Sequence, residues 1–189
     1  MISCYICAHS LTNPTNDMLA PFNLKNWIDE HRHLLKPPVG NQQVFKLNDD
    51  FIVMVVGGPN KRKDFHWEEG EELFYQLEGD IVVRIINEKG EQEDVNIREG
   101  DMFLLPARVP HSPRRPAGTV GLVIERYRRS GEKDKLMWVC ENTACNNLLH
   151  EASFDMKDIV AELPVVMKNF MDSEDLRTCK KCGQVMEAV

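Results

Sequence analysis

Short apolar runs separated by turn residues dominate the middle of the chain, between about residues 44 and 128. The runs read VFKL, FIVMVV, ELFYQL, DIVVRII, EDVNI, MFLLP and TVGLVIERY, and the breaks between them include GGPN, EGD, NEKGE, REGD and PAG. Many short strands at close spacing, joined by glycine-containing turns, are typical of an antiparallel sandwich or barrel. The pattern therefore predicts a mainly β fold.

Helical spacing appears on either side of this region. In FNLKNWIDEHRHLLKPP, Asn23 is placed to cap a helix and the double proline stops it. The apolar positions of that helix are Leu24, Trp27, Ile28 and Leu35. A second amphipathic stretch contains Pro164, which predicts two short helices or a kink. Its apolar positions are Ile159, Val160, Leu163, Val166, Met167 and Phe170.

The length of 189 residues, 42% of them apolar, favours one packed domain with an appendage. We divide the chain into an N-terminal extension (1–21), a β barrel (22–135) and a C-terminal segment (136–189). The net charge of −7 and the lack of a basic run argue against a nucleic-acid binder. No apolar stretch approaches the roughly 18 to 20 residues of a membrane span, and the N-terminus lacks a signal or transit pattern. We therefore expect a soluble cytoplasmic protein.

Two histidines and one carboxylate within the β region form a candidate metal site. His66 and Glu72 flank the turn-like Glu69-Gly70, so we expect a hairpin that sets them across from one another. His111 follows a later probable strand. Two histidines with one carboxylate form a facial set that favours ferrous iron and leaves coordination positions open. The alternative is that each histidine is a surface or hydrogen-bonded core residue.

Four of the six cysteines form a second candidate site near the C-terminus. Cys179 and Cys182 are two residues apart and precede a glycine, which is the shape of a metal knuckle, and Cys140 and Cys145 are their candidate partners. Four thiolates in a tetrahedron select zinc or iron. The remaining pair, Cys4 and Cys7, is interpreted as two free thiols in the extension.

The spacing of these residues resembles the two cupin motifs. His66, Glu72 and Gly79 match the first motif, and Gly100, Pro106 and His111 match the second. Glu68 stands where the first motif usually has a second histidine, and Arg115 stands in place of the asparagine of the second. The resemblance thus implies a cupin (jelly-roll) barrel with three metal ligands instead of four.

From about residue 22 to the C-terminus, the chain resembles the 3-hydroxyanthranilate 3,4-dioxygenase family. The resemblance rests on KPPVGN, GGPNKRKDFHWEEGEELFYQLEGD and REGDMFLLPARVPHSPRRPAGTVGLVIER. It implies Fe(II)-dependent cleavage of 3-hydroxyanthranilate by dioxygen to 2-amino-3-carboxymuconate semialdehyde, the precursor of quinolinate in NAD biosynthesis from tryptophan. It also implies a second iron, or zinc, at the four cysteines. Because a cupin barrel with exposed strand edges often dimerises through them, we expect a homodimer.

By motif position, the resemblance assigns the iron ligands to His66, Glu72 and His111 and the substrate pocket to Arg62, Arg115 and Glu125. These residue types suit the binding of an aromatic carboxylate, because the planar guanidinium of arginine can bind a carboxylate at two points. A buried Glu125 would need an arginine or the substrate as its partner. The alternative is that the arginines are a solvated basic rim.

Three other functions stay open at this stage. One is another three-ligand cupin dioxygenase that acts on a different ring or on a thiol. The second is a cupin binding module without turnover, and the third is a zinc-ribbon interaction protein whose barrel is a scaffold. Fold alone does not decide among them, so the chemistry of the site must.

Overall fold

The computed structural model of the chain describes residues 21–37, 40–45 and 50–189. The proposed N-terminal extension, with Cys4 and Cys7, lies outside these residues except for Pro21. Within the described ranges the helices are α1 (Leu24–His31), the short 3₁₀ helix η1 (Arg32–Leu34), α2 (Ile159–Met171) and α3 (Glu174–Arg177). The strands are β1 (Asn41–Gln43), β2 (Phe51–Gly57), β3 (Asp64–Trp67), β4 (Glu72–Glu78), β5 (Ile81–Ile86), β6 (Gln92–Ile97), β7 (Met102–Leu105), β8 (His111–Arg114), β9 (Val120–Arg126), β10 (Asp134–Val139) and β11 (Leu148–Phe154).

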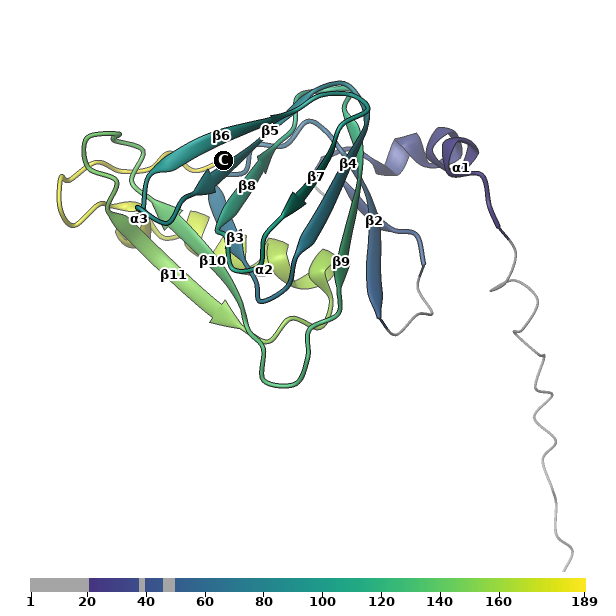
Figure 1. Ribbon diagram of the computed structural model, residues 1–189. Helices are drawn as coiled ribbons and strands as arrows, with labels where there is room; N and C mark the ends of the chain where they lie inside the picture. Colours follow the sequence, from purple (N-terminus) through teal and green to yellow (C-terminus); the bar gives the residue numbers. More distant parts are fainter. Residues whose placement is uncertain (1–20, 38–39, 46–49) are drawn as a thin grey trace, which may run out of the picture.

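The strands form two antiparallel sheets that face each other (Figure 1). One sheet has the order β1-β2-β9-β4-β7, and the other has the order β11-β10-β3-β8-β5-β6. Strands that follow one another in the chain therefore often lie in different sheets, which is the arrangement of a jelly-roll barrel. The prediction of a mainly β barrel with an N-terminal helix and a helical, cysteine-bearing C-terminal segment is confirmed.

The core fills the space between the sheets and is closed by α2. Phe74 of β4 and Trp138 of β10 are almost fully buried, and Leu163 and Phe170 of α2 join the same apolar cluster. The rings of Trp138 and Phe170 stack with centroids 4.2 Å apart. The C-terminal helix is thereby fixed to the six-stranded sheet, and it runs behind the strands in the view of Figure 1.

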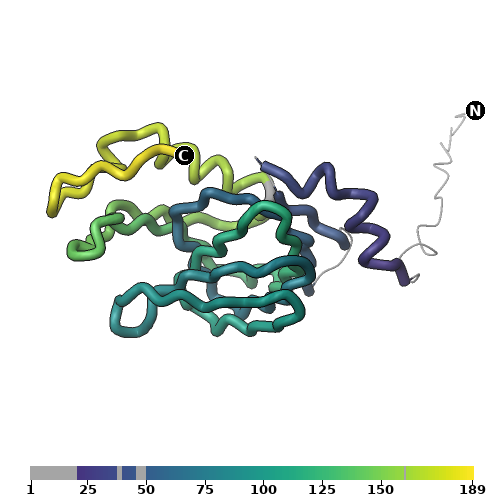
Figure 2. The backbone as a smooth tube through the Cα atoms, turned by 90° about the horizontal axis from the view of Figure 1, so that it is seen from above, coloured from purple at the N-terminus to yellow at the C-terminus, as the bar shows by residue number. Residues whose placement is uncertain are grey.

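Both helical stretches occur where the sequence predicts them. The Asn23 side chain accepts a hydrogen bond from the backbone N–H of Asn26 at 2.9 Å, which caps α1. The second stretch forms one helix with Pro164 inside it, so of the two predicted alternatives, two short helices or a kink, the separate helices do not occur. The helix α1 and the cysteine-bearing end of the chain lie on opposite sides of the molecule (Figure 2). No helix of the described residues is long and apolar enough to cross a membrane.

The predicted hairpin between His66 and Glu72 does not form. The strand β3, which contains His66, pairs with β8 and β10, whereas β4, which starts at Glu72, pairs with β7 and β9 in the other sheet. The short connection between them crosses from one sheet to the other. His66 and Glu72 still meet, because the inner faces of the two sheets are opposed.

Candidate active site

Strand pairing across the two sheets brings the predicted metal residues together. His66 lies directly opposite His111 on β3 and β8, and Glu72 lies directly opposite Glu125 on β4 and β9. All four side chains are buried and come from the facing sheets. Ligand atoms of His66, Glu72 and His111 lie within 4.8 Å of one another. The sequence-predicted triad is therefore assembled in space.

The donor atoms of this triad suit one small cation. His111 Nδ1 donates a hydrogen bond to the carbonyl oxygen of Val109 at 3.0 Å, which leaves Nε2 free to ligate. His111 Nε2 lies 2.7 Å from Glu72 Oε2. Two donors at right angles, each roughly 2.1 Å from one ion, would be about 3 Å apart, so this spacing fits adjacent ligands.

His66 is oriented by a carboxylate that the sequence patterns do not indicate. Its Nε2 donates to Asp134 Oδ2 at 2.7 Å, which leaves Nδ1 as the nitrogen that can ligate. Asp134 is in turn held by Arg128, whose Nε and Nη2 lie 2.8 Å and 2.6 Å from the two carboxylate oxygens. A carboxylate that fixes the ring of a metal-ligating histidine is a common feature of metal centres.

The protonation states of His66, Glu72 and His111 favour the binding of a cation. Burial opposes ionisation of Glu72, but the charge and hydrogen bond of His111 outweigh it and lower the pKa of Glu72 to about 2. Burial lowers the pKa of His66 in spite of the Asp134 carboxylate. Burial also acts to lower the pKa of His111, but the charge and hydrogen bond of Glu72 outweigh burial and raise that pKa. The site thus offers one carboxylate and one neutral imidazole, and a cation would compete for the proton on His111.

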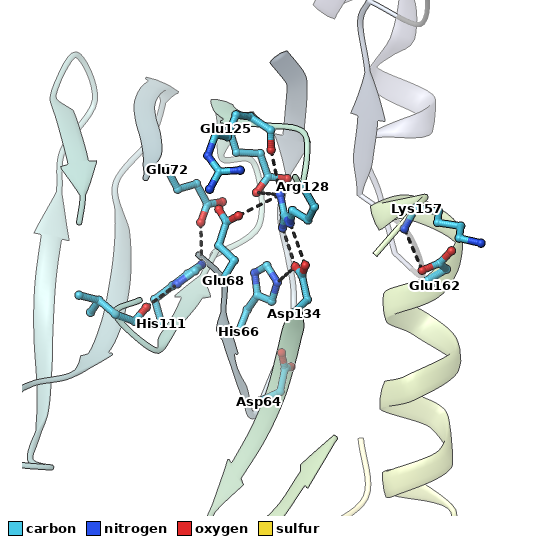
Figure 3. A network of polar contacts seen from close by, with 12 residues as sticks. Asp64, His66, Glu68, Glu72, His111, Glu125, Arg128, Asp134, Lys157 and Glu162 are labelled. Carbon is cyan, nitrogen blue, oxygen red and sulfur yellow. Dashed lines mark hydrogen bonds and ion pairs between the residues drawn. The ribbon is translucent and has the colours of Figure 1, made fainter. Parts of the chain in front are cut away.

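A buried acidic cluster lies behind Glu72 (Figure 3). Carboxylate oxygens of Glu68, Glu72 and Glu125 lie within 4.8 Å of one another. Arg128 Nη1 lies 3.0 Å from Glu68 Oε2 and 3.1 Å from Glu125 Oε2, so this one guanidinium contacts both carboxyl groups as well as Asp134. Burial raises the pKa of Glu68 to about 10 and that of Glu125 to about 7.

A cavity of about 410 Å³ opens beside the triad. Arg62 and Arg115 line it together with His66, Glu72 and His111, and apolar side chains complete the wall. The apolar wall includes Met54, Val56, Phe74 and Val123 from the sheets and Ile159, Leu163 and Met167 from α2. Glu125 is not among the residues that line this cavity; it lies behind Glu72 and pairs with Arg128.

The two arginines of the cavity differ in their partners. Arg62 forms an ion pair with the fully buried Asp64, and its Nε lies 3.2 Å from both carboxylate oxygens. Arg115 is only 3% exposed, and no carboxylate pairs with it in the described part of the chain. Burial lowers the pKa of Arg115 to about 10, so it stays charged at neutral pH. A buried cation without a counter-ion is costly unless a ligand supplies the anion.

The four predicted cysteines form a second cluster at the other end of the molecule. Cys140 Sγ lies 3.6 Å from Cys182 Sγ, and Cys145 Sγ lies 3.7 Å from Cys179 Sγ. All four sulfur atoms are within 4.8 Å of one another, and none is in a disulfide. Sulfur atoms arranged tetrahedrally around an ion at about 2.3 Å are about 3.8 Å apart, so this cluster fits a closed metal site.

The backbone supports a thiolate at Cys179, whereas burial raises the pKa of Cys140 to about 12. Burial opposes ionisation of Cys179, but hydrogen bonds from the backbone of Cys182 and Lys181 lower its pKa to about 6. Gly183 has a φ of +79°, and its N–H donates to the carbonyl oxygen of Cys179 at 2.9 Å, which closes the knuckle. The wider spacing of Cys140 and Cys145 is accommodated by a turn in which the N–H of Cys145 donates to the carbonyl oxygen of Asn142 at 2.8 Å.

Comparison with known proteins finds a family and relatives that share one description. The family described as 3-hydroxyanthranilic acid dioxygenase matches residues 18–171. A protein of Jannaschia sp. (strain CCS1) named 3-hydroxyanthranilate 3,4-dioxygenase is 54% identical over 168 residues, covering 88% of this chain and 91% of that protein. One of the same name from Xanthomonas euvesicatoria pv. vesicatoria (strain 85-10) is 52% identical over 171 residues, covering 90% and 94%.

Solved structures are more distant. A cupin-2 domain containing protein from Shewanella frigidimarina matches with a TM-score of 0.43 and 16% identity, covering 52% of this chain and 91% of that chain. A protein from Neisseria meningitidis matches with a TM-score of 0.45 and 23% identity, covering 57% and 99%.

Proposed function

Because the chain belongs to the 3-hydroxyanthranilic acid dioxygenase family, we propose that it cleaves the ring of 3-hydroxyanthranilate with dioxygen. Both oxygen atoms enter the product, 2-amino-3-carboxymuconate semialdehyde, and the ring carbon–carbon bond beside the hydroxyl is broken. This product closes to quinolinate without an enzyme, which places the reaction in NAD biosynthesis from tryptophan.

The observation that most supports this substrate is the unpaired charge of Arg115. Within the described ranges, the cavity holds one buried guanidinium that lacks an anionic partner, next to a triad suited to a cation. An aromatic ring with a carboxylate at one end would provide an anion for Arg115. Two metal-binding groups at its other end would provide ligands for the cation of the triad. Arginine can receive that carboxylate through two parallel hydrogen bonds.

We assign the metal of the triad as Fe(II), held by His66, Glu72 and His111. When bound there, ferrous iron supplies open coordination positions and the redox chemistry that activates dioxygen toward an aromatic ring. The four-cysteine site would hold a second iron, or zinc, with a closed shell and a structural role. In this proposal residues 22–135 contain the catalytic site and residues 136–189 contain the cysteine site.

The residues around the substrate would then act as follows. Arg115 binds the carboxylate and sets the direction of the ring. Arg62, held by its ion pair with Asp64, would offer the N–H groups that Asp64 does not use to the oxygen atoms that become negative in the transition state. Glu125 lies outside the cavity wall, and its raised pKa lets it hold or release one proton near neutral pH beside Glu72. The apolar wall excludes water from the ring.

Oxygen uptake with two substrates tests this assignment. The substrates are 3-hydroxyanthranilate and 2-aminophenol, which lacks the carboxylate. For Arg115→Ala, removing one partner of a buried charged pair costs about 2 to 5 kcal/mol, so kcat/KM for 3-hydroxyanthranilate should fall roughly 30- to several-thousand-fold. Arg115→Lys should restore only part of the loss, because a point charge lacks the planar fork. Turnover of 2-aminophenol should be slow in the native protein and change little.

The matched control is Arg114→Ala at equal iron content. Arg114 is the preceding residue in the chain, but it does not line the cavity of the triad; it lines a second depression over β5 and β6, whose wall also includes Arg115. This variant should keep the native selectivity. Equal proportional losses for both substrates in Arg115→Ala would overturn the carboxylate contact.

A further inference from the structure

We propose that Gln76 and Gly121 are positioning residues for Arg115, which together fix its guanidinium in the orientation that receives the substrate carboxylate. The proposal rests on the proposed function of Arg115. It arises from a contact between β4 and β9, where Gln76 and Gly121 are directly opposite each other in the strand register. Arg115, just after β8 in the other sheet, reaches across the barrel to this point.

Gln76 presents its oxygen to Arg115 because both of its amide hydrogens are already used. Its Nε2 donates to the carbonyl oxygens of Glu78 at 2.9 Å and Val120 at 3.1 Å. The amide can satisfy these two acceptors only with nitrogen on that side, so Oε1 must face the other way. There it accepts from Arg115 Nη1 at 3.3 Å. Gln76 is 1% exposed, so water cannot replace either contact.

Gly121 provides the space that the guanidinium occupies. A Cβ atom at this position would lie 2.8 Å from Arg115 Nη1, 2.8 Å from Gln76 Oε1 and 3.4 Å from Arg115 Nη2. The first two distances are too short for any side chain, even a methyl group. The atoms in conflict are the ends of two side chains and not the backbone, so an alanine would push Arg115 and Gln76 aside while β9 keeps its pairing.

The backbone of Arg115 is anchored separately by Asn60. The N–H of Arg115 donates to Asn60 Oδ1 at 3.1 Å, and the N–H of Asn60 donates to the carbonyl oxygen of Arg115 at 3.0 Å. Asn60 Nδ2 also donates to the carbonyl oxygen of Pro113 at 3.0 Å. Arg115 is therefore held at its backbone end by Asn60 and at its guanidinium end by Gln76 and Gly121.

The neutrality of the Gln76 acceptor matters for substrate binding. A glutamate in its place would form an ion pair with Arg115 and cancel the charge that the substrate needs. It would also lack the N–H groups that bind the carbonyl oxygens of Glu78 and Val120. The amide instead fixes the direction of the guanidinium and leaves its positive charge available.

Three variants test the proposal: Gln76→Met, Gly121→Ala and Gln76→Glu. Each should weaken binding of 3-hydroxyanthranilate to the iron-loaded protein, measured calorimetrically without oxygen, by about 10- to 100-fold, the loss expected for a hydrogen bond to a charged group. Oxygen uptake should show a similar loss of kcat/KM. Binding and turnover of 2-aminophenol should change less than about threefold. Leu122→Ala, a half-buried neighbour in β9, is the control for general weakening of the strand and should affect neither substrate selectively.

A double variant separates a positioning role from a structural one. If Gln76 acts through Arg115, adding Gln76→Met to Arg115→Ala should cause no further loss for 3-hydroxyanthranilate. Independent, multiplied losses in the double variant, or equal losses for both substrates in the single variants, would overturn the positioning role. Loss of selectivity in Arg115→Ala combined with native selectivity in Gln76→Met and Gly121→Ala would also overturn it. A lack of selective loss in Arg115→Ala itself would instead refute the proposed carboxylate contact.

Discussion

Glu68, Glu72 and Glu125 place three buried carboxyl groups close together, and their environments give them different charges. Glu72 is next to His111, which lowers its pKa to about 2 against the effect of burial. Glu68 has no such partner, and burial together with the nearby Glu125 raises its pKa to about 10 although Arg128 acts in the opposite direction. Glu72 is thus kept ionised on the side of the triad, and Glu68, farther from the triad, is kept protonated.

This difference predicts how the stability of the metal-free protein depends on pH. Unfolded Glu68 loses its proton near the ordinary glutamate pKa of 4.5, whereas folded Glu68 keeps it until about pH 10. Between these values the folded state binds more protons, so its stability falls as the pH rises, by at most about 1.4 kcal/mol per pH unit for one retained proton. Glu68→Gln, which is always neutral, should flatten this slope in urea unfolding measured from pH 5 to 9. Glu71→Gln, at an exposed position, should keep it. Parallel slopes for all three proteins would contradict this explanation.

At the scale of elements, hydrophobic runs and turn residues predict most of the barrel, but strand pairing decides what the site contains. Several strands, among them β3, β8, β10 and β11, correspond to none of the apolar runs in the sequence. β11 is an edge strand whose residues are all exposed or half-buried, and β10 begins with Asp134 and Lys135, so neither resembles a continuous apolar run. Missing β10 meant missing Asp134 as the partner of His66, because only the pairing of β10 with β3 brings them together.

The cysteine cluster joins two segments that are distant in the chain. The loop after β10 contributes Cys140 and Cys145, and the turn after α3 contributes Cys179 and Cys182. An ion held there would fix the C-terminal segment to the six-stranded sheet, at a distance from the catalytic cavity, whose wall includes none of the four cysteines.

We therefore predict a structural effect when this cluster is broken. The double substitution Cys179→Ser and Cys182→Ser should remove one metal ion per chain and lower Tm by about 4 to 8 °C, as expected for the loss of a cross-link that contributes about 2 kcal/mol. Turnover per iron-loaded triad should stay within about twofold. Scanning calorimetry, metal analysis and oxygen uptake on the same preparation measure all three. A variant with a fully loaded triad and an unchanged Tm, but no turnover, would mean that the cluster is catalytic.

At the scale of the whole molecule, the sequence predicted the residues of both candidate metal sites but not the residues that orient them. His66, Glu72 and His111 have motif spacing, and so do the four cysteines. Their supporting partners, Asp134, Arg128, Gln76 and Gly121, are brought close only by pairing and facing of strands that are far apart in sequence. No local pattern signals such a partner, which explains why they were missed.

The assembly proposed for the molecule is a homodimer. In the five-stranded sheet β7 is an edge strand, and its Met102 and Leu104 are 65% and 53% exposed. Exposed apolar side chains on a sheet edge are commonly covered by another chain. Sedimentation equilibrium should give twice the mass of the 21.8 kDa chain at micromolar concentration. A mass of one chain across that range would contradict the proposal.

The proposed function requires that the triad hold the iron at which 3-hydroxyanthranilate and dioxygen react. The most direct measurement is oxygen consumption with 3-hydroxyanthranilate, combined with iron analysis, for the native chain and for His111→Ala in parallel. We predict that the native protein consumes one dioxygen per substrate. His111→Ala should keep the fold and the cysteine-site metal, lose the iron of the triad and consume no dioxygen. An iron content unchanged by the substitution, or undiminished oxygen consumption without His111, would contradict this role of the triad.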